Sequence, residues 1–182
     1  MSAPGAKLTV FAGPRFACVR IVGRANFVSG NELKTLANEL LARGCTYFVL
    51  ELSECVLMDS TFLGILAGFG LRLKGIQGKG DHCAIELLNP NPRIKELLED
   101  LGVLHLFYLN TGAMVSPPDA KQEDHFAANP TRQEITRSCL EAHEILMGIN
   151  PQNVAKFKDV AAFLAEDLKK QESDSGGSRS NP

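Results

Sequence analysis

The sequence lacks paired cysteines, long apolar runs and any cluster of one charge, and each absence excludes a class of protein. The five cysteines lie far apart with no C-x-x-C pair, which excludes a disulfide framework and a zinc site of the usual spacing. Unpaired cysteines suit a reducing compartment, where they behave as small hydrophobic side chains. We expect such packing for Cys18, Cys45 and Cys83, which lie in or beside apolar runs.

No segment of the chain has the pattern of a membrane or export element. The apolar runs fall short of the ~18 residues that a transmembrane helix needs. The first residues, MSAPGAKLTVF, also lack the apolar stretch of a secretion signal. We therefore expect a cytoplasmic protein without a membrane span.

Charge and histidine spacing do not indicate nucleic acid, a metal or a cofactor. The net charge is −2 with both signs scattered, whereas duplex-binding proteins usually cluster Lys and Arg. The four histidines show no paired spacing, so we expect structural or surface roles for them, His143 included. The glycine-rich segment 75–80 follows a helix and lacks the Walker A spacing, so we expect a flexible turn there. The sequence thus predicts no metal site, no cofactor and no enzymatic centre.

Residues 1–110 alternate strand and helix patterns in the order β-β-α-β-α-β-α-β. Ser29, with Glu32 three residues later, is predicted to cap the first helix, and Asp59 or Ser60 the second. The apolar run 46–52 favours a central strand covered on both faces. Strands are predicted at 7–11, 16–22, 46–52, 82–88 and 104–109.

This order predicts an α/β fold with a mixed, largely parallel sheet packed against helices. Residues 1–110 form the expected domain, and the Pro-, Asp- and Gln-rich residues 111–130 a linker. Residues 131–170 are predicted to form a C-terminal helical hairpin with a buried seam, opening on a capping box of Thr131 and Glu134. The apolar-poor residues 171–182 are predicted to be a disordered tail.

The segment Asp59-Ser60-Thr61 is the main candidate functional site. It follows the strong strand and opens an apolar helix, which places the Ser60 hydroxyl at the positive end of the helix dipole near backbone N–H groups. A phosphate there would bring about −1.5 to −2 charges to the edge of an apolar helix. A plain helix cap is the alternative role for Asp59 and Ser60, and the two roles are compatible.

The chain resembles the STAS domain family, and within it the anti-sigma factor antagonists of bacteria. The resemblance covers roughly residues 7–110 and is carried by Asp59-Ser60-Thr61 with Leu63-Gly64, by the upstream strand TYFVLELSE and by the segment 21–26 (IVGRAN). It implies a module that binds an anti-sigma factor, often a serine kinase, and thereby frees a sigma factor. It also implies that the kinase phosphorylates the domain and releases it, and that a metal-dependent phosphatase restores it.

The resemblance assigns roles to individual residues. Ser60 is the implied phosphoacceptor, flanked by Asp59 and Thr61. Asn26 stands where many members have an Asp close to the acceptor, and Phe62 where many have Gly, which makes the predicted interface bulkier. The residues expected to contact the partner are Met58, Phe62 and Leu63.

Other functions remain open at this level. One alternative is a non-phosphorylated STAS subunit of a signalling or lipid-transport complex, and another is a regulator that binds a small ligand or nucleotide. The hairpin 131–170 is not needed by a simple antagonist. We expect it to cover an exposed flank of the domain or to join two copies of the chain as a homo-oligomer.

Overall fold

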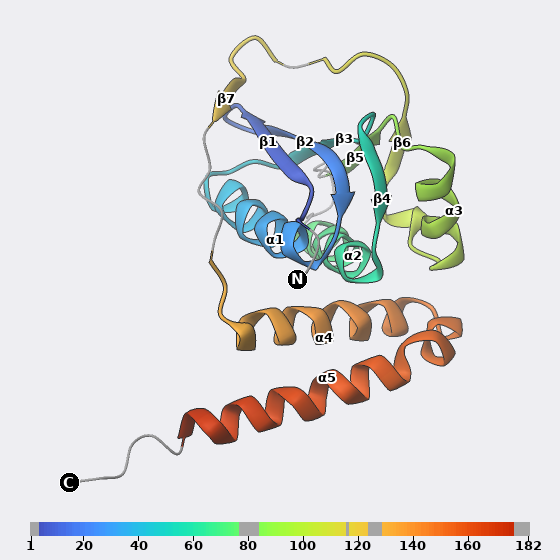
Figure 1. Cartoon of the computed structure of the whole chain (residues 1–182). Helices are drawn as coiled ribbons and strands as arrows, with labels where there is room; N and C mark the ends of the chain where they lie inside the picture. The colour runs from blue at the N-terminus through green and yellow to red at the C-terminus, as the bar shows by residue number, and fades with distance from the viewer. Residues whose placement is uncertain (1–3, 77–83, 116, 124–128, 177–182) are drawn as a thin grey trace, which may run out of the picture.

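The computed structural model describes residues 4–76, 84–115, 117–123 and 129–176 (Figure 1). It contains one mixed sheet, two long helices packed against one face of it, a short helix of residues 92–100 at one edge, and a helical hairpin stacked outside the two long helices (Figure 1). The elements are β1 (Lys7–Ala12), β2 (Phe16–Ala25), α1 (Phe27–Ala42), β3 (Tyr47–Glu51), β4 (Cys55–Met58), α2 (Ser60–Ile76), β5 (Ala84–Leu88), α3 (Pro92–Asp100), the 3₁₀ turn η1 (Leu104–Leu106), β6 (Tyr108–Asn110), β7 (Lys121–Glu123), α4 (Arg132–Ile149) and α5 (Gln152–Gly176).

The sheet has the strand order β6-β5-β3-β2-β1-β7, with β4 paired to β2 outside this path. β1 and β7 run antiparallel to their neighbours, whereas the pairs β2–β3, β3–β5, β5–β6 and β2–β4 are parallel. The predicted α/β fold with a mixed, largely parallel sheet is confirmed. The central position predicted for the strand at 46–52 is confirmed as well, because β3 lies between β2 and β5.

The two faces of the sheet are covered in different ways. α1 and α2 lie against one face and enclose the main core, which includes Leu50, Leu66 and Leu87 (Figure 1). The other face carries a smaller cluster around Cys18 and Val49. Met114 and Ala120, both from the predicted linker, pack on this cluster. β3 is therefore buried on both sides, by helices on one and by an irregular segment on the other.

β2 serves two neighbours because it changes partner along its length. Its first half pairs with β3, and its last residues, from Gly23 onward, pair with β4. The register shifts at Gly23, whose φ of 98° lies in the region that favours glycine. β4 itself was missed by the sequence prediction. The strand predicted at 104–109 is also corrected, since 104–106 form a 3₁₀ turn and only 108–110 join the sheet.

The division of the chain needs two corrections. Part of the predicted linker, Lys121–Glu123, is β7 and extends the sheet beside β1. The first residues of the predicted tail belong to α5, which continues to Gly176, while 177–182 lie outside the described residues. The hairpin is present as predicted, and the capping box of Thr131 and Glu134 is confirmed. The boundaries of the domains otherwise stay a prediction.

Four of the five cysteines lie in the described residues and are free thiols. Cys18 and Cys45 are buried as predicted, whereas Cys83 and most of the glycine-rich segment 75–80 fall outside the described residues. Among the helices that the structure describes, none combines the length and apolar character needed to cross a membrane.

Candidate functional site

The candidate site lies where two parallel strands end side by side. β2 ends at Ala25 and β4 at Met58, so the residues that follow them, Asn26 and Asp59, meet at one edge of the sheet. The backbone N–H of Asp59 donates to the carbonyl of Ala25 at 2.9 Å. α1 and α2 both begin at this edge, which gathers two helix N-termini around the predicted motif.

Asp59 ties the two helix starts together. Its Oδ1 accepts from the N–H of Phe62 at 2.7 Å, which caps α2, and its Oδ2 accepts from the N–H of Phe27 at 3.1 Å, in the first turn of α1. The capping role predicted for Asp59 is therefore present. Because the N–H of Phe62 already donates to Asp59, this N–H is not one of the free backbone donors expected near Ser60.

Asn26 caps α1, which corrects the cap predicted at Ser29. The Asn26 side chain accepts from the N–H groups of Val28 and Ser29 at 3.1 and 3.4 Å. Ser29 Oγ in turn accepts from the N–H of Asn26 at 3.0 Å, which completes a capping box one turn earlier than predicted. The capping role accounts for an Asn at position 26, because an N-cap residue needs a hydrogen-bond acceptor but no charge.

Burial raises the pKa of the Asp59 carboxyl above its ordinary value, and the N–H groups of Phe62 and Phe27 oppose that shift. When a carboxyl binds its proton more tightly in the folded state than in the unfolded state, its ionisation lowers the free energy of unfolding. We expect the free energy of unfolding of wild type to fall relative to that of Asp59→Asn as the pH rises from about 4 through the raised pKa. Urea denaturation at several pH values measures this difference. Asp159→Asn, the same change on the exposed surface of α5, is the matched control. The opposite trend would show that the N–H groups outweigh burial.

Ser60 is half-buried, and its hydroxyl contacts a histidine from the distant hairpin. Its Oγ lies 3.0 Å from Nε2 of His143 in α4. His143 is only 5% exposed, and its Nδ1 lies 2.7 Å from the carbonyl oxygen of Cys139. A carbonyl only accepts, so Nδ1 carries the proton. In the neutral ring Nε2 is then the acceptor, and the Ser60 hydroxyl donates to it.

A hydroxyl that donates to an imidazole is also the pairing found in nucleophilic catalysis. Such chemistry needs free hydrogen-bond donors for the developing negative charge, most often backbone N–H groups at a helix start such as this one. The N–H of Phe62 is bound to Asp59, and the N–H of Leu63 bonds the Asp59 carbonyl at 3.0 Å. Because these donors are committed within the helix cap, we interpret the Ser60–His143 pair as a contact between α2 and α4.

The side chains expected to contact a partner lie in the core, and this prediction needs correction. Met58, Phe62 and Leu63 are 2%, 0% and 1% exposed. Thr61 is buried too. The apolar side chains of α2 pack against the sheet on one side and against α4 on the other. The extra bulk of Phe62 therefore lies inside the domain.

Two residues near the motif were not recognised from the sequence. Val28, in the first turn of α1, is 42% exposed and directly follows Phe27, whose N–H binds Asp59. His143 reaches Ser60 from 83 residues away. Its signal was its helical spacing, because it lies four residues after Cys139 and three before Leu146 on the predicted apolar face.

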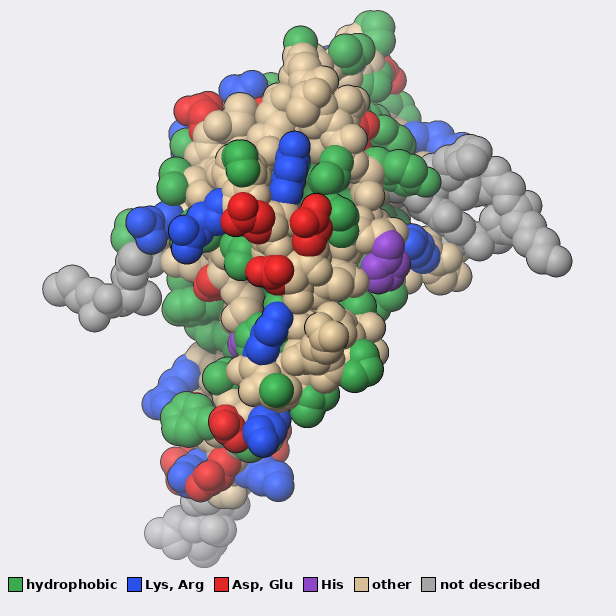
Figure 2. All heavy atoms as spheres, turned by 90° about the vertical axis from the view of Figure 1, so that its right-hand side faces the viewer, with side chains coloured by type: hydrophobic (Ala, Val, Ile, Leu, Met, Phe, Trp, Pro, Cys, Tyr) green, Lys and Arg blue, Asp and Glu red, His purple; other side chains and the backbone are tan. Residues whose placement is uncertain are grey.

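Outside the motif, the described residues offer little for a ligand. No group of three His, Cys, Asp or Glu side chains among them is placed to hold a metal. Figure 2 shows the face that carries α3, where acidic and basic side chains are interspersed with apolar ones. The acidic residues of α3, including Glu96, Glu99 and Asp100, are exposed there, which agrees with a solvated helix face.

The family model of the STAS domain matches residues 9–116, which is more than half of the chain. The chain belongs to the STAS domain family. The match includes β4 and the start of α2, so Asp59 and Ser60 are part of the STAS domain. It ends before α4, so the hairpin is an addition to that domain.

Comparison with solved structures finds similar chains among anti-sigma factor antagonists. Two are SpoIIAA, in its unphosphorylated form (15% identity, 60% of this chain and 90% of that one covered, TM-score 0.47) and in its phosphorylated form, described as a Bacillus cell fate determinant (15%, 60% and 92%, 0.48). A third is an anti-sigma factor antagonist from Mycobacterium paratuberculosis (21%, 60% and 90%, 0.48). No curated protein sequence matches the chain.

Proposed function

We propose that this chain is a protein-binding module that acts as an anti-sigma factor antagonist and is switched by phosphate on Ser60. One observation carries the proposal: in a STAS domain, a half-buried serine opens α2 directly after a capping aspartate. The unphosphorylated module binds an anti-sigma factor that is also a serine kinase, and the phosphorylated module releases it. A metal-dependent phosphatase restores the binding form.

The contact surface in this proposal is the edge where α1 and α2 begin. The side chains of Met58, Phe62 and Leu63 are not available there, because they are buried. The partner instead contacts Ser60 and the exposed Val28, and Asp59 keeps the two helix starts in register through its hydrogen bonds. A phosphate on Ser60 lies next to the Asp59 carboxylate, so it adds negative charge where negative charge is already present.

Binding assays with acidic and neutral variants test the switch. A charge forced into an apolar contact costs a few kcal/mol, so we expect Ser60→Asp to weaken partner binding by about two orders of magnitude. Ser60→Ala should bind at least as tightly as wild type. Each variant serves as bait in extracts of the native host, and the affinity for the captured anti-sigma factor is then measured.

Ser173→Asp introduces the same charge on the exposed surface of α5 and is the matched control. A one-phosphate mass shift at Ser60 in protein from cells is the second expected result. Equal binding by Ser60→Asp and Ser173→Asp contradicts the switch. It would favour a STAS subunit that works without phosphorylation.

A further inference from the structure

α4 is seated in a groove of α2 that glycine creates. A Cβ at Gly64 would lie 2.7 Å from the Cβ of Ala142 and closer still to the Ala142 carbonyl oxygen. A Cβ at Gly68 would lie 2.7 Å from Cδ1 of Ile145. Gly64 and Gly68 are four residues apart, so both lie on the face of α2 that meets α4. Any side chain at Gly64 would therefore push α4 away.

Ser60 lies one turn before Gly64 on the same face, and α4 covers it. His143, the residue after Ala142, is hydrogen-bonded to Ser60 Oγ at 3.0 Å. Cys139, one turn earlier on α4, is hydrogen-bonded to the side chain of Thr61, and burial raises the pKa of its thiol. Both hydroxyl residues of the first turn of α2, Ser60 and Thr61, are thus in contact with α4.

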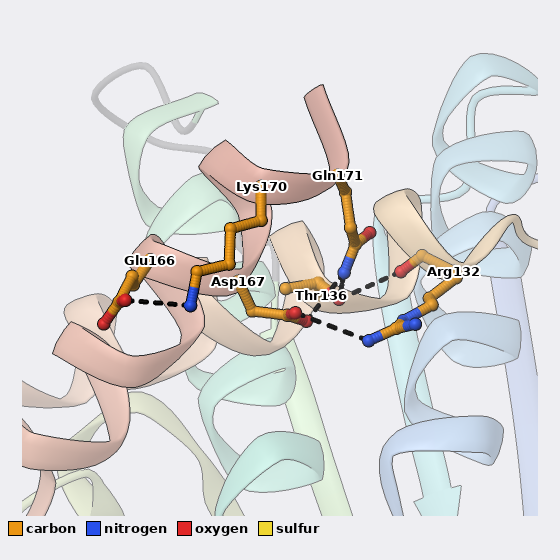
Figure 3. Close-up of polar contacts among 6 residues, drawn as sticks. All are labelled: Arg132, Thr136, Glu166, Asp167, Lys170 and Gln171. Atoms are coloured by element: carbon orange, nitrogen blue, oxygen red, sulfur yellow. Dashed lines mark hydrogen bonds and ion pairs between the residues drawn. The ribbon is translucent and has the colours of Figure 1, made fainter. Parts of the chain in front are cut away.

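The hairpin is internally connected, so α4 and α5 can move together about the start of α5, which Asn153 and Lys156 hold to the carbonyls of Leu101 and Asp100. Figure 3 shows Arg132 of α4 in contact with Asp167 of α5, while Gln171 of α5 donates to Thr136 Oγ1 at 3.1 Å. Arg137 and Glu172 form a further ion pair between the two helices at 2.9 Å. These contacts between α4 and α5 hold the two helices to each other and do not involve the STAS domain.

The contact between the hairpin and the STAS domain is close at Gly64 but open along the flank that faces α1. A groove of about 200 Å³, partly open to solvent, lies between α1, α2 and α4, with apolar residues such as Leu33 and Phe69 and charged residues such as Arg72 in its lining. At its edge, the exposed Lys34 bridges to Glu141 at 2.8 Å. A groove that solvent can enter buries little apolar surface, and an exposed ion pair adds little stability. We therefore expect α4 to separate from α2 starting at this flank, at a lower free energy than unfolding of the core.

We propose that the α4–α5 hairpin is a releasable cover of Ser60, and that it competes with the protein partner for the start of α2. The part of the inference that concerns competition with a partner rests on the proposed function. A phosphate on Ser60 and the hydrogen bond to His143 use the same oxygen, and a nearly buried imidazole 3.0 Å away leaves no space for the added group. Release of α4 therefore precedes both phosphorylation and partner binding.

Alkylation of Cys139 in the full chain measures the release directly. N-ethylmaleimide is the probe, and peptide mass spectrometry reads the rate at each cysteine. Cys139 is partly exposed in the closed structure, so it has a basal labelling rate. Gly64→Ala should raise that rate about tenfold, because release of α4 uncovers the side of the thiol that contacts Thr61. Gly148→Ala is the matched control, since a Cβ there meets nothing within 4 Å. It should leave the rate unchanged.

Cys18 and Cys45 report on the fold in the same experiment, because both are buried in the STAS domain. If they are labelled in Gly64→Ala, that variant has lost its fold and Ile145→Asp replaces it. Ile145→Asp places a charge on α4 against Gly68 and leaves α2 unchanged. An unchanged rate at Cys139 in a folded variant overturns the proposal.

Partner binding separates the two proposals. A variant with the cover released should bind the anti-sigma factor at least about tenfold more tightly than Gly148→Ala. Faster labelling without tighter binding overturns the competition while the proposed function stands. Faster labelling in a chain that binds no anti-sigma factor overturns the proposed function, and the cover remains established.

Discussion

Phe62→Ala is expected to lower the free energy of unfolding by about 3–5 kcal/mol. The ring is 0% exposed and belongs to the main core between the sheet and α2, so its removal leaves a cavity. Urea denaturation followed by circular dichroism measures the loss. A loss of this size would show that the Phe62 side chain stabilises the core of the domain, whereas the sequence predicted a contact with a partner.

Phe163→Ala is the matched control for Phe62→Ala. Phe163 lies on α5 and is 69% exposed, so the same truncation should change stability by less than about 0.5 kcal/mol. If Phe62→Ala leaves stability unchanged and weakens partner binding instead, Phe62 belongs to the interface after all.

Asn153→Ala is expected to destabilise the protein by about 1–3 kcal/mol. Asn153, at the start of α5, is fully buried, and its Nδ2 donates to the carbonyls of Leu101 and Leu146 at 2.9 and 2.8 Å. The substitution removes the side-chain donor from the Leu101 carbonyl, whereas the Leu146 carbonyl keeps the N–H of Asn150. Asn153 thus anchors the hairpin to the segment after α3.

The comparison for Asn153→Ala is Gln152→Ala, one residue earlier on the same helix. Gln152 is exposed, so its truncation should leave the midpoint of thermal unfolding almost unchanged. Equal, small effects of both substitutions would show that the buried amide does not hold the hairpin in place.

The elements that could be predicted are those whose signal lies within one segment. The apolar run of β3 indicates burial wherever it packs, and Thr131 with Glu134 makes a capping box from four consecutive residues. Asp59 was recognised as a cap for the same reason. Asn26 was missed as the cap of α1 because Ser29 offers an equally good local pattern, and the end of β2 decides between them.

β4 and the burial of α2 could not be predicted in this way. β4 is four residues long, and it forms because β2 shifts its register at Gly23 and offers a free edge. α2 is apolar around most of its circumference, which fits both a helix with a partner surface and an enclosed helix. The contact with α4, some 80 residues further along the chain, decides the question.

The sequence by itself determined that an aspartate and a serine open an apolar helix directly behind a strand, because caps and strand periodicity are local properties of the chain. Only the tertiary structure decided that this serine is covered. The close approach of Gly64 to Ala142, and the imidazole of His143 that it brings to Ser60, depend on the shapes of two helices that meet far apart in sequence.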